Sequence, residues 1–219
     1  TGAGFASGGM NALKFEGWEK VFVGLGFSTF LGFAGGIVIM SILYLIFRNY
    51  ARSRVTRAAK ILQIISSGFM AFSHGTNDGQ KFIGVFVLAL MLGNVYTEFH
   101  VPLWVQIAAA LTMGIGTACG GWRIIRMMGV RMTRLQPMQG FAAEFAASSI
   151  IQLASHFGIP LSTTHTINTS IMGVSTAKRF SAVRWPIALN IVKAWILTFP
   201  ACAIIAYLIT KLLLLISSS

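Results

Sequence analysis

A single aspartate stands in a polar stretch between two apolar arms of the chain. The stretch, SHGTNDGQK, occupies Ser73–Lys81, and the arms are Ile61–Phe72 and Phe82–Leu92. Insertion of an aspartate at the centre of a bilayer costs about 2.5–3.5 kcal/mol of free energy on insertion scales. Asp78 is therefore expected to have an interaction partner or a functional role. With the side-chain carbonyl of Asn77 it offers ligands for a hard cation such as sodium, or a site for a proton.

The charged neighbours of Asp78 allow more than one interpretation. Lys81 follows three residues later. It either neutralises Asp78 or presents a fixed positive charge to an anion. A simple ion pair of the two is the structural alternative to a functional carboxylate. His74 either relays protons or hydrogen-bonds within the polar stretch.

A second polar segment, PLSTTH, begins at Pro160. Three hydroxyl residues, Ser162, Thr163 and Thr164, precede His165 at the expected N-terminus of a helix. Unpaired amides and a partial positive charge make such an end a binding site for phosphate-like anions. One hydroxyl would be enough to cap the helix. Three hydroxyls therefore favour an anion site, with His165 as a further contact or compensating charge.

Glu144 lies in the apolar segment QGFAAEFAASS and is the other isolated acid. Its alanine, glycine and phenylalanine neighbours predict that it faces the interior of a helical bundle. It either exchanges protons in a coupling step or pairs with Lys193, and neither interpretation dominates.

These residues must be positioned by membrane-spanning helices. Hydrophobic residues make up 55% of the 219-residue chain and charged residues 10%, whereas a soluble domain carries about 25% charged residues. Long apolar segments at Val21–Phe47, Leu103–Trp122 and Ala194–Thr210 predict three spans. We therefore expect an all-α, multi-pass integral membrane protein. Residues 1–20 are expected to be a linker or the end of a preceding segment, and residues 21–219 the membrane domain.

The net charge of +12 comes from short loops rather than from a nucleic-acid-binding surface. By the positive-inside rule the basic loops are cytoplasmic, and the loop Asn94–Pro102, without Lys or Arg, is external. We therefore exclude nucleic acid as a partner. The sequence also lacks a nucleophile–base pair or a metal cluster with usable spacing, so an enzyme is not expected. The basic residues form three groups: Arg48, Arg52, Arg54, Arg57 and Lys60; Arg123, Arg126, Arg131 and Arg134; Lys178, Arg179 and Arg184.

The sidedness of these loops constrains the segments between them. Ile61–Gly93 must cross once, and as a helix its 33 residues would span about 50 Å. Its polar centre predicts a discontinuous transmembrane helix that unwinds at Ser73–Lys81. The segment between the second and third basic groups must begin and end on the cytoplasmic side. Met138–Phe157 is one helical arm and Thr166–Val174 a second, too short to cross, so we predict a re-entrant hairpin.

Two motifs in this order resemble the inorganic phosphate transporter family. FSHGTNDGQKFIG, Phe72–Gly84, is similar to its G-x-N-D signature, and GIPLSTTHTINTSIMGV, Gly158–Val174, to its S-T-T-H segment. Gly140–Ser148 and the sequence KAWILTFPA also fit. The chain resembles the C-terminal repeat of the family, and most of all its bacterial low-affinity phosphate permeases. This resemblance implies a place in the bacterial inner membrane.

The resemblance implies a cotransporter of two inverted repeats, with phosphate bound between them at the helix breaks. It implies phosphate contacts from Asn77 and from the three hydroxyls, a coupling-ion or proton role for Asp78 and Glu144, and sodium ligands in Asn77 and Asp78 where sodium couples. One copy of each motif occurs here. The N-terminal repeat is therefore an expected partner, upstream or in a separate polypeptide, and the family suggests a homodimer.

The NDGQK form, with Lys81, resembles proton-coupled bacterial members that carry phosphate with a divalent metal. We therefore favour protons as the coupling ion over sodium, and expect no cofactor. Another oxyanion such as sulfate remains an alternative substrate, because hydroxyls at a helix end do not distinguish tetrahedral anions. A passive channel or a structural membrane subunit is the alternative from another class.

Overall fold

The structure, a computed structural model, describes residues 1–12 and 15–217, and every regular element within them is a helix. The long helices are α2 (Phe15–Phe47), α3 (Arg52–Leu92), α4 (Leu103–Arg126), α5 (Pro137–His156), α6 (Thr163–Lys178) and α7 (Trp185–Ser217). Shorter elements are α1 (Gly2–Gly8), the 3₁₀ turns η1 (Gly9–Ala12) and η3 (Phe180–Ala182), and the π-helical η2 (Met127–Met132). The all-α prediction is confirmed.

Three of these helices are long and apolar enough to cross a membrane: Gly17–Phe47, Leu103–Trp122 and Trp185–Ile216. They contain or match the three spans predicted from the sequence. On α4 the large apolar side chains of Leu103, Ile107, Leu111 and Ile115 are all more than half exposed. A face of this kind is stable against lipid or another apolar surface, and not against water.

The chain divides into two compact units, Thr1–Val23 with Arg184–Ser219, and Gly24–Val183. In the first unit α1 lies along α7, where the glycine at position 2 allows contact with the backbone of Ala203. The rings of Phe5 and Tyr207 approach to 6.0 Å in the same contact. The stretch expected to be a linker, or the end of a preceding segment, is thus mostly helical, and its origin remains a prediction.

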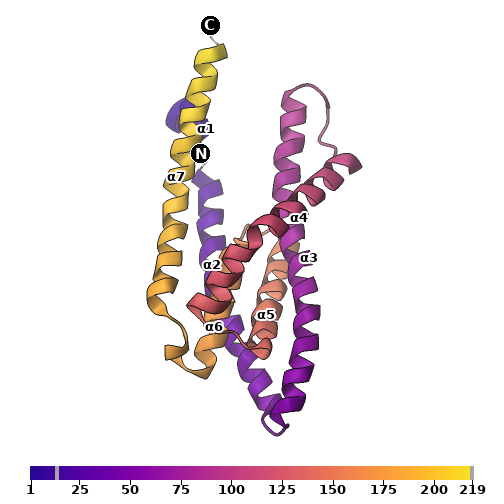
Figure 1. Ribbon diagram of the computed structural model, residues 1–219. Coiled ribbons are helices and arrows are strands. Elements are labelled where there is room, and N and C mark those ends of the chain that lie inside the picture. The colour runs from indigo at the N-terminus through magenta and orange to yellow at the C-terminus, as the bar shows by residue number, and fades with distance from the viewer. Residues whose placement is uncertain (13–14, 218–219) are drawn as a thin grey trace. The chain divides into compact units, whose positions relative to one another are not determined.

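In the second unit α3 packs along α5, α5 returns antiparallel as α6, and α4 leaves from the far end of α3 (Figure 1). Close approach of α2 to α6 depends on glycine, because a Cβ on Gly32 or Gly36 would overlap the backbone of α6. Likewise, a Cβ on Gly173 would overlap the carbonyl of Phe33. Small residues at helix contacts allow such approach where no hydrophobic effect drives association.

The predicted break in the first motif is wrong. α3 continues through Ser73–Lys81 as one helix from Arg52 to Leu92. His74, Asn77, Asp78 and Lys81 find partners in one another and in the α5–α6 turn, while the backbone keeps its helical hydrogen bonds. The glycines cost about 1 kcal/mol each in helix propensity, which a long, packed helix tolerates.

The α5–α6 hairpin is present, but its second arm is longer than predicted. α6 has 16 residues, about 24 Å of helix. Ser162 caps it, so that it begins at Thr163, three residues before the expected start, and it ends at Lys178. Its length therefore does not itself forbid a crossing. The hairpin closes at its base, where Ser175 donates a 3.1 Å hydrogen bond to Thr133. Whether the hairpin is re-entrant in a membrane remains a prediction.

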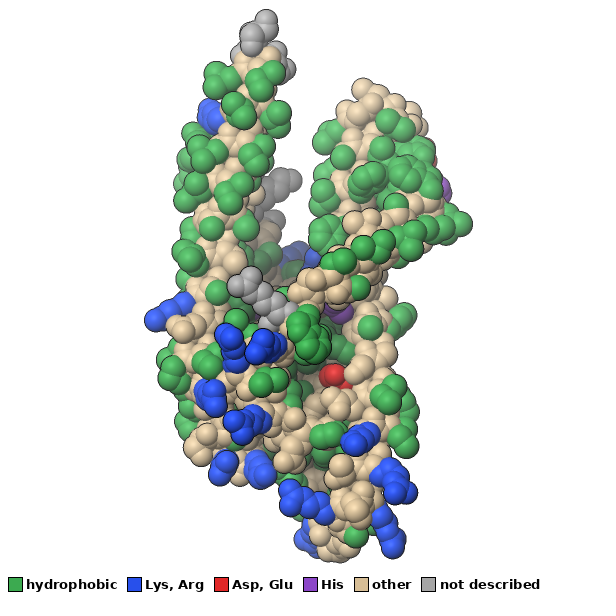
Figure 2. All heavy atoms as spheres, in the orientation of Figure 1, with side chains coloured by type: hydrophobic (Ala, Val, Ile, Leu, Met, Phe, Trp, Pro, Cys, Tyr) green, Lys and Arg blue, Asp and Glu red, His purple; other side chains and the backbone are tan. Residues whose placement is uncertain are grey.

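The first and third basic groups lie at the same end of this unit. Arg48, Arg52 and Lys178 line one cavity with the start of α5, and Lys and Arg side chains gather around the α2–α3 turn (Figure 2). This arrangement is the one that the positive-inside rule requires of two cytoplasmic loops.

Candidate functional site

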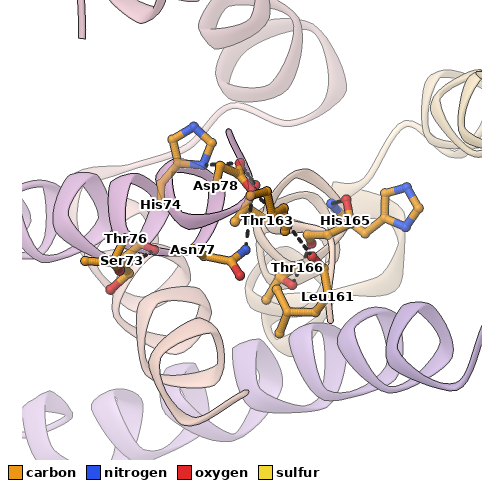
Figure 3. Close-up of polar contacts among 11 residues, drawn as sticks. Ser73, His74, Thr76, Asn77, Asp78, Leu161, Thr163, His165 and Thr166 are labelled. Carbon is orange, nitrogen blue, oxygen red and sulfur yellow. Dashed lines mark hydrogen bonds and ion pairs between the residues drawn. The ribbon is translucent and has the colours of Figure 1, made fainter. Parts of the chain in front are cut away.

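Asp78 lies at the centre of a polar cluster that joins the two sequence motifs. We call His74, Asn77, Asp78, Lys81 and Thr163 the Asp78 cluster. The lysine ammonium lies 2.9 Å from Oδ1, and the Asn77 amide donates to the same oxygen at 3.3 Å. The threonine hydroxyl donates to Oδ2 at 2.9 Å, and the His74 Nδ1 lies 3.1 Å from that oxygen (Figure 3).

Helical spacing brings these groups together. His74, Asp78 and Lys81 are separated by four and three positions on α3, so they share one face of the helix. Thr163 comes from the first turn of α6 and is 4% exposed. The unbroken helix therefore positions the carboxylate, and the hairpin turn delivers the hydroxyl.

Lys81 also binds the hairpin directly. Its ammonium donates a second hydrogen bond, at 3.1 Å, to the backbone carbonyl of Leu161. The pairing of Asp78 with Lys81 that the sequence left open is therefore present. It neutralises the carboxylate and ties the α5–α6 turn to the middle of α3.

The three hydroxyls of the second motif have three different environments. Ser162 caps α6 and accepts the backbone N–H of His165 at 3.4 Å. The hydroxyl of Thr163 donates its hydrogen bond to Asp78. Thr164 is exposed at the helix N-terminus. The imidazole of His165 points away from Asp78 (Figure 3).

The Asp78 cluster does not present an oxygen cage for sodium in this arrangement. Both carboxylate oxygens already face donor groups, and the α3 backbone keeps its carbonyls in helical bonds. Nor do residues 1–12 and 15–217 contain a group of three or more His, Cys, Asp or Glu side chains that could hold a metal ion. Sodium ligation by Asp78 and Asn77 remains a prediction that would require displacing Lys81.

Glu144 belongs to a separate polar contact, between α5 and α3. Ser66 and Ser67 both donate hydrogen bonds to its carboxylate, the latter at 3.0 Å to each oxygen. Ser66 precedes Asp78 by 12 positions on α3, which corresponds to about 18 Å along the helix. The structure therefore keeps the two acids apart, and the pairing of Glu144 with Lys193 remains a prediction.

A cavity of about 700 Å³ lies between α3 and α4 beside the cluster. His74 and Asp78 are on its wall, and the rest of its lining is largely apolar, including Phe82, Phe86 and Val105. A few polar groups converging on an apolar cavity are a common form of small-molecule site.

Two features of the site were not identified from the sequence. The serine pair at positions 66 and 67 interrupts the apolar run ILQIISSGF, and this irregularity could have indicated a buried partner for a carboxylate. Ser73 was not singled out either, although it is fully buried. Within the described part of the chain its hydroxyl has no hydrogen-bond partner.

Comparison with known proteins gives a consistent result. Residues 46–206 match the phosphate transporter family. A protein of Rhizobium meliloti, described as a probable low-affinity inorganic phosphate transporter, is 40% identical over 94% of this chain and 62% of its own length. The Bacillus subtilis protein of the same description is 35% identical over 97% of this chain and 65% of its own length. A Mycobacterium bovis relative is 38% identical, and this chain covers 50% of it.

The fold is also that of a solved structure, described as the sodium-dependent phosphate transporter. It superposes with a TM-score of 0.86 at 19% identity and covers 98% of this chain and 71% of its own. This chain thus spans about half to two-thirds of the relatives named above. The two motifs, the three apolar helices and the match over residues 46–206 establish that this chain is an integral membrane protein of the phosphate transporter family.

Proposed function

We propose that this chain forms part of a secondary transporter that carries inorganic phosphate across a bacterial inner membrane by cation symport. The observation that carries the proposal is the 2.9 Å hydrogen bond between Thr163 and Asp78, which joins the two signature motifs beside a cavity. The printed descriptions of the relatives, as inorganic phosphate transporters, support the substrate.

In this proposal phosphate binds at the N-terminus of α6. Thr164 is exposed there, and the first-turn amides provide donors and a partial positive charge. A bare carboxylate nearby would repel the anion. The ammonium of Lys81, 2.9 Å from Asp78, removes most of that repulsion. Asn77, 7% exposed and next to Asp78, would supply a further amide contact.

Protons are the favoured coupling ion, and the polar environment of Glu144 supports this choice. A hydroxyl donates to an ionised carboxylate and can rotate to accept from a protonated one. The two serine partners of Glu144 can therefore accommodate either state without leaving a buried group unpaired. Asp78 instead has a fixed cation beside it, and this ammonium occupies the place that sodium would need.

The proposal also includes a second repeat with its own copy of each motif, since one copy of each is present here. Substrate would lie between the two repeats near the midplane of the membrane, the arrangement typical of inverted-repeat transporters. Assembly as a homodimer and transport of phosphate with a divalent metal are further parts of this proposal.

The test is uptake of radiolabelled phosphate by the transporter in proteoliposomes, with proton and sodium gradients imposed independently. We expect an inward proton gradient to drive accumulation without sodium. Accumulation that follows sodium and ignores the proton gradient would refute proton coupling. Inhibition by excess sulfate as strong as by unlabelled phosphate would instead favour a general oxyanion permease.

A passive channel makes a different prediction. Its flux would continue without any driving-ion gradient, and Asp78→Asn would change its selectivity rather than abolish uptake. Symport predicts that this substitution stops accumulation.

A further inference from the structure

The cavity at the α2–α3 turn has the composition of a lipid headgroup site. Its volume is about 430 Å³, and it is lined by parts of α2, α3, α5 and α6. Three cationic side chains, Arg48, Arg52 and Lys178, line it together with apolar residues such as Met40, Leu43 and Phe47. The lining is therefore amphipathic, with α2 supplying much of its apolar part.

Within the described part of the unit Gly24–Val183, no acidic side chain lines this cavity. The three acids of that unit, Asp78, Glu98 and Glu144, all lie outside the lining. Within the described residues, the two recorded ion pairs of the protein both involve Asp78 instead. An anion from outside the chain is thus the natural counter-charge.

Two helix ends add to this field. α3 begins at Arg52 with Ala51 as its N-cap, so no side chain caps its first amides. α5 begins at Pro137, and its first residues also line the cavity, although a capping box of Gln136 and Gln139 already pairs two of its terminal amides. The N-termini of both helices carry partial positive charge, which favours an anionic group.

The position of the cavity at the end of a membrane-spanning helix favours a lipid as the source of this anion. The cavity lies at the end of α2, a helix apolar enough to span the bilayer, within the basic loops that the positive-inside rule assigns to the cytoplasm. On this last part of α2, Ile42, Leu45 and Ile46 are exposed by 45%, 65% and 55%. These side chains give acyl chains an exposed apolar surface on the last turns of α2, which end next to Arg48 in the sequence.

We propose that this cavity binds an anionic phospholipid of the cytoplasmic leaflet. Its headgroup phosphate lies between Arg48, Arg52 and Lys178, and its acyl chains follow the exposed face of α2. Basic cavities between membrane helices on the cytoplasmic side bind anionic headgroups in this way. The occupant links α2, α3, α5 and α6 from outside the transport site.

The test is a titration of the purified, delipidated transporter with dioleoylphosphatidylglycerol in detergent, with retained lipid measured by mass spectrometry. Arg48→Gln/Arg52→Gln removes two charges from the cavity. We expect its apparent affinity for the lipid to fall at least about tenfold. Arg54→Gln/Arg57→Gln removes the same charge from the same helix end, outside the lining, and should bind as the wild type does.

Equal losses in the two double variants would overturn the proposal, because attraction would then be diffuse. Dioleoylphosphatidylcholine should be retained weakly by every variant, and retention equal to that of the anionic lipid would also overturn it. A third arm uses inorganic phosphate alone. If phosphate competes with the lipid at similar concentrations, the cavity is a free-phosphate site and the lipid proposal fails.

If the double variant does not fold, Lys178→Gln provides the same comparison with a single charge. Its matched control is Arg179→Gln, the next residue, which is exposed and outside the lining. Weaker lipid retention in the first variant alone supports the proposal, and indistinguishable retention contradicts it.

Discussion

The hydroxyl of Thr163 donates a 2.9 Å hydrogen bond to the carboxylate of Asp78 across 85 positions of the chain. Thr163 lies in the first turn of α6, and Asp78 lies in the middle of α3. The bond is buried on the threonine side and is reinforced by Lys81, which holds both the carboxylate and the hairpin turn. Substitutions in this contact should therefore affect transport directly.

Thr163→Val keeps the shape of the side chain and removes its hydroxyl. A hydrogen bond to a charged group contributes about 1.5–3 kcal/mol, so we expect phosphate uptake in proteoliposomes to fall at least about tenfold. Thr163→Ser retains the hydroxyl and should restore most of the rate. Equal uptake by the valine and serine variants would show that the bond to Asp78 is not used.

Lys81→Met should change the response to sodium. Removing the ammonium leaves the Asp78 carboxylate with neutral donors and open to a small cation. We expect phosphate uptake by this variant to become stimulated by an inward sodium gradient, which the wild type should ignore. Lys81→Arg keeps the charge and serves as the control. If neither variant responds to sodium, the lysine does not determine ion selectivity.

Glu144→Gln tests the second acid separately. The glutamine can still accept hydrogen bonds from the serines of α3, but it cannot bind or release a proton in the coupling step. We expect proton-driven accumulation of phosphate to drop at least about tenfold. Exchange of internal for external phosphate, which needs no net proton movement, should persist.

The control for this substitution is Ser67→Ala, which removes one of the donors and keeps the carboxylate. It should leave both activities measurable. Loss of exchange together with accumulation in Glu144→Gln would indicate a structural role for Glu144, and proton-driven accumulation at the wild-type level would exclude it from coupling.

Gly36→Ala should destabilise the contact of α2 with α6. An added Cβ would overlap the carbonyl of Ser170, a backbone atom that cannot move aside easily. Overpacking of this kind costs about 1–3 kcal/mol. Gly26→Ala is the matched control on the same helix, because a Cβ there meets no atom within 4 Å. Thermal unfolding followed by tryptophan fluorescence should show a lower midpoint for the first variant only.

The apolar helices could be predicted from the sequence because hydropathy over about 20 residues is sufficient to define a span. The start of α4 at Leu103 also matches the predicted span, whereas the helix continues past the predicted end at Trp122 to Arg126. The sidedness of the basic loops agrees with the common cavity lined by Arg48, Arg52 and Lys178.

The course of α3 could not be predicted, because glycine and polar residues allow an unwound backbone without requiring one. What decides the outcome is whether the polar side chains have partners. Those partners, Thr163 and the Leu161 carbonyl, lie on a hairpin about eighty positions away in sequence. Local composition alone therefore predicted an unwound segment at Ser73–Lys81 that the structure does not have. A separate long-range contact has the same consequence for Ser66 and Ser67, which lie 78 and 77 positions from their partner Glu144.

Because α3 is one uninterrupted helix of 41 residues, its residues move together. Ser66 and Ser67, which bind Glu144, and Asp78 therefore keep fixed positions relative to one another along α3. The backbone changes direction on the other side of the contact, where Gly158 adopts a φ of 65° in the turn between α5 and α6. The Thr163–Asp78 contact would then open by movement of the α5–α6 turn relative to a straight, unmoving α3.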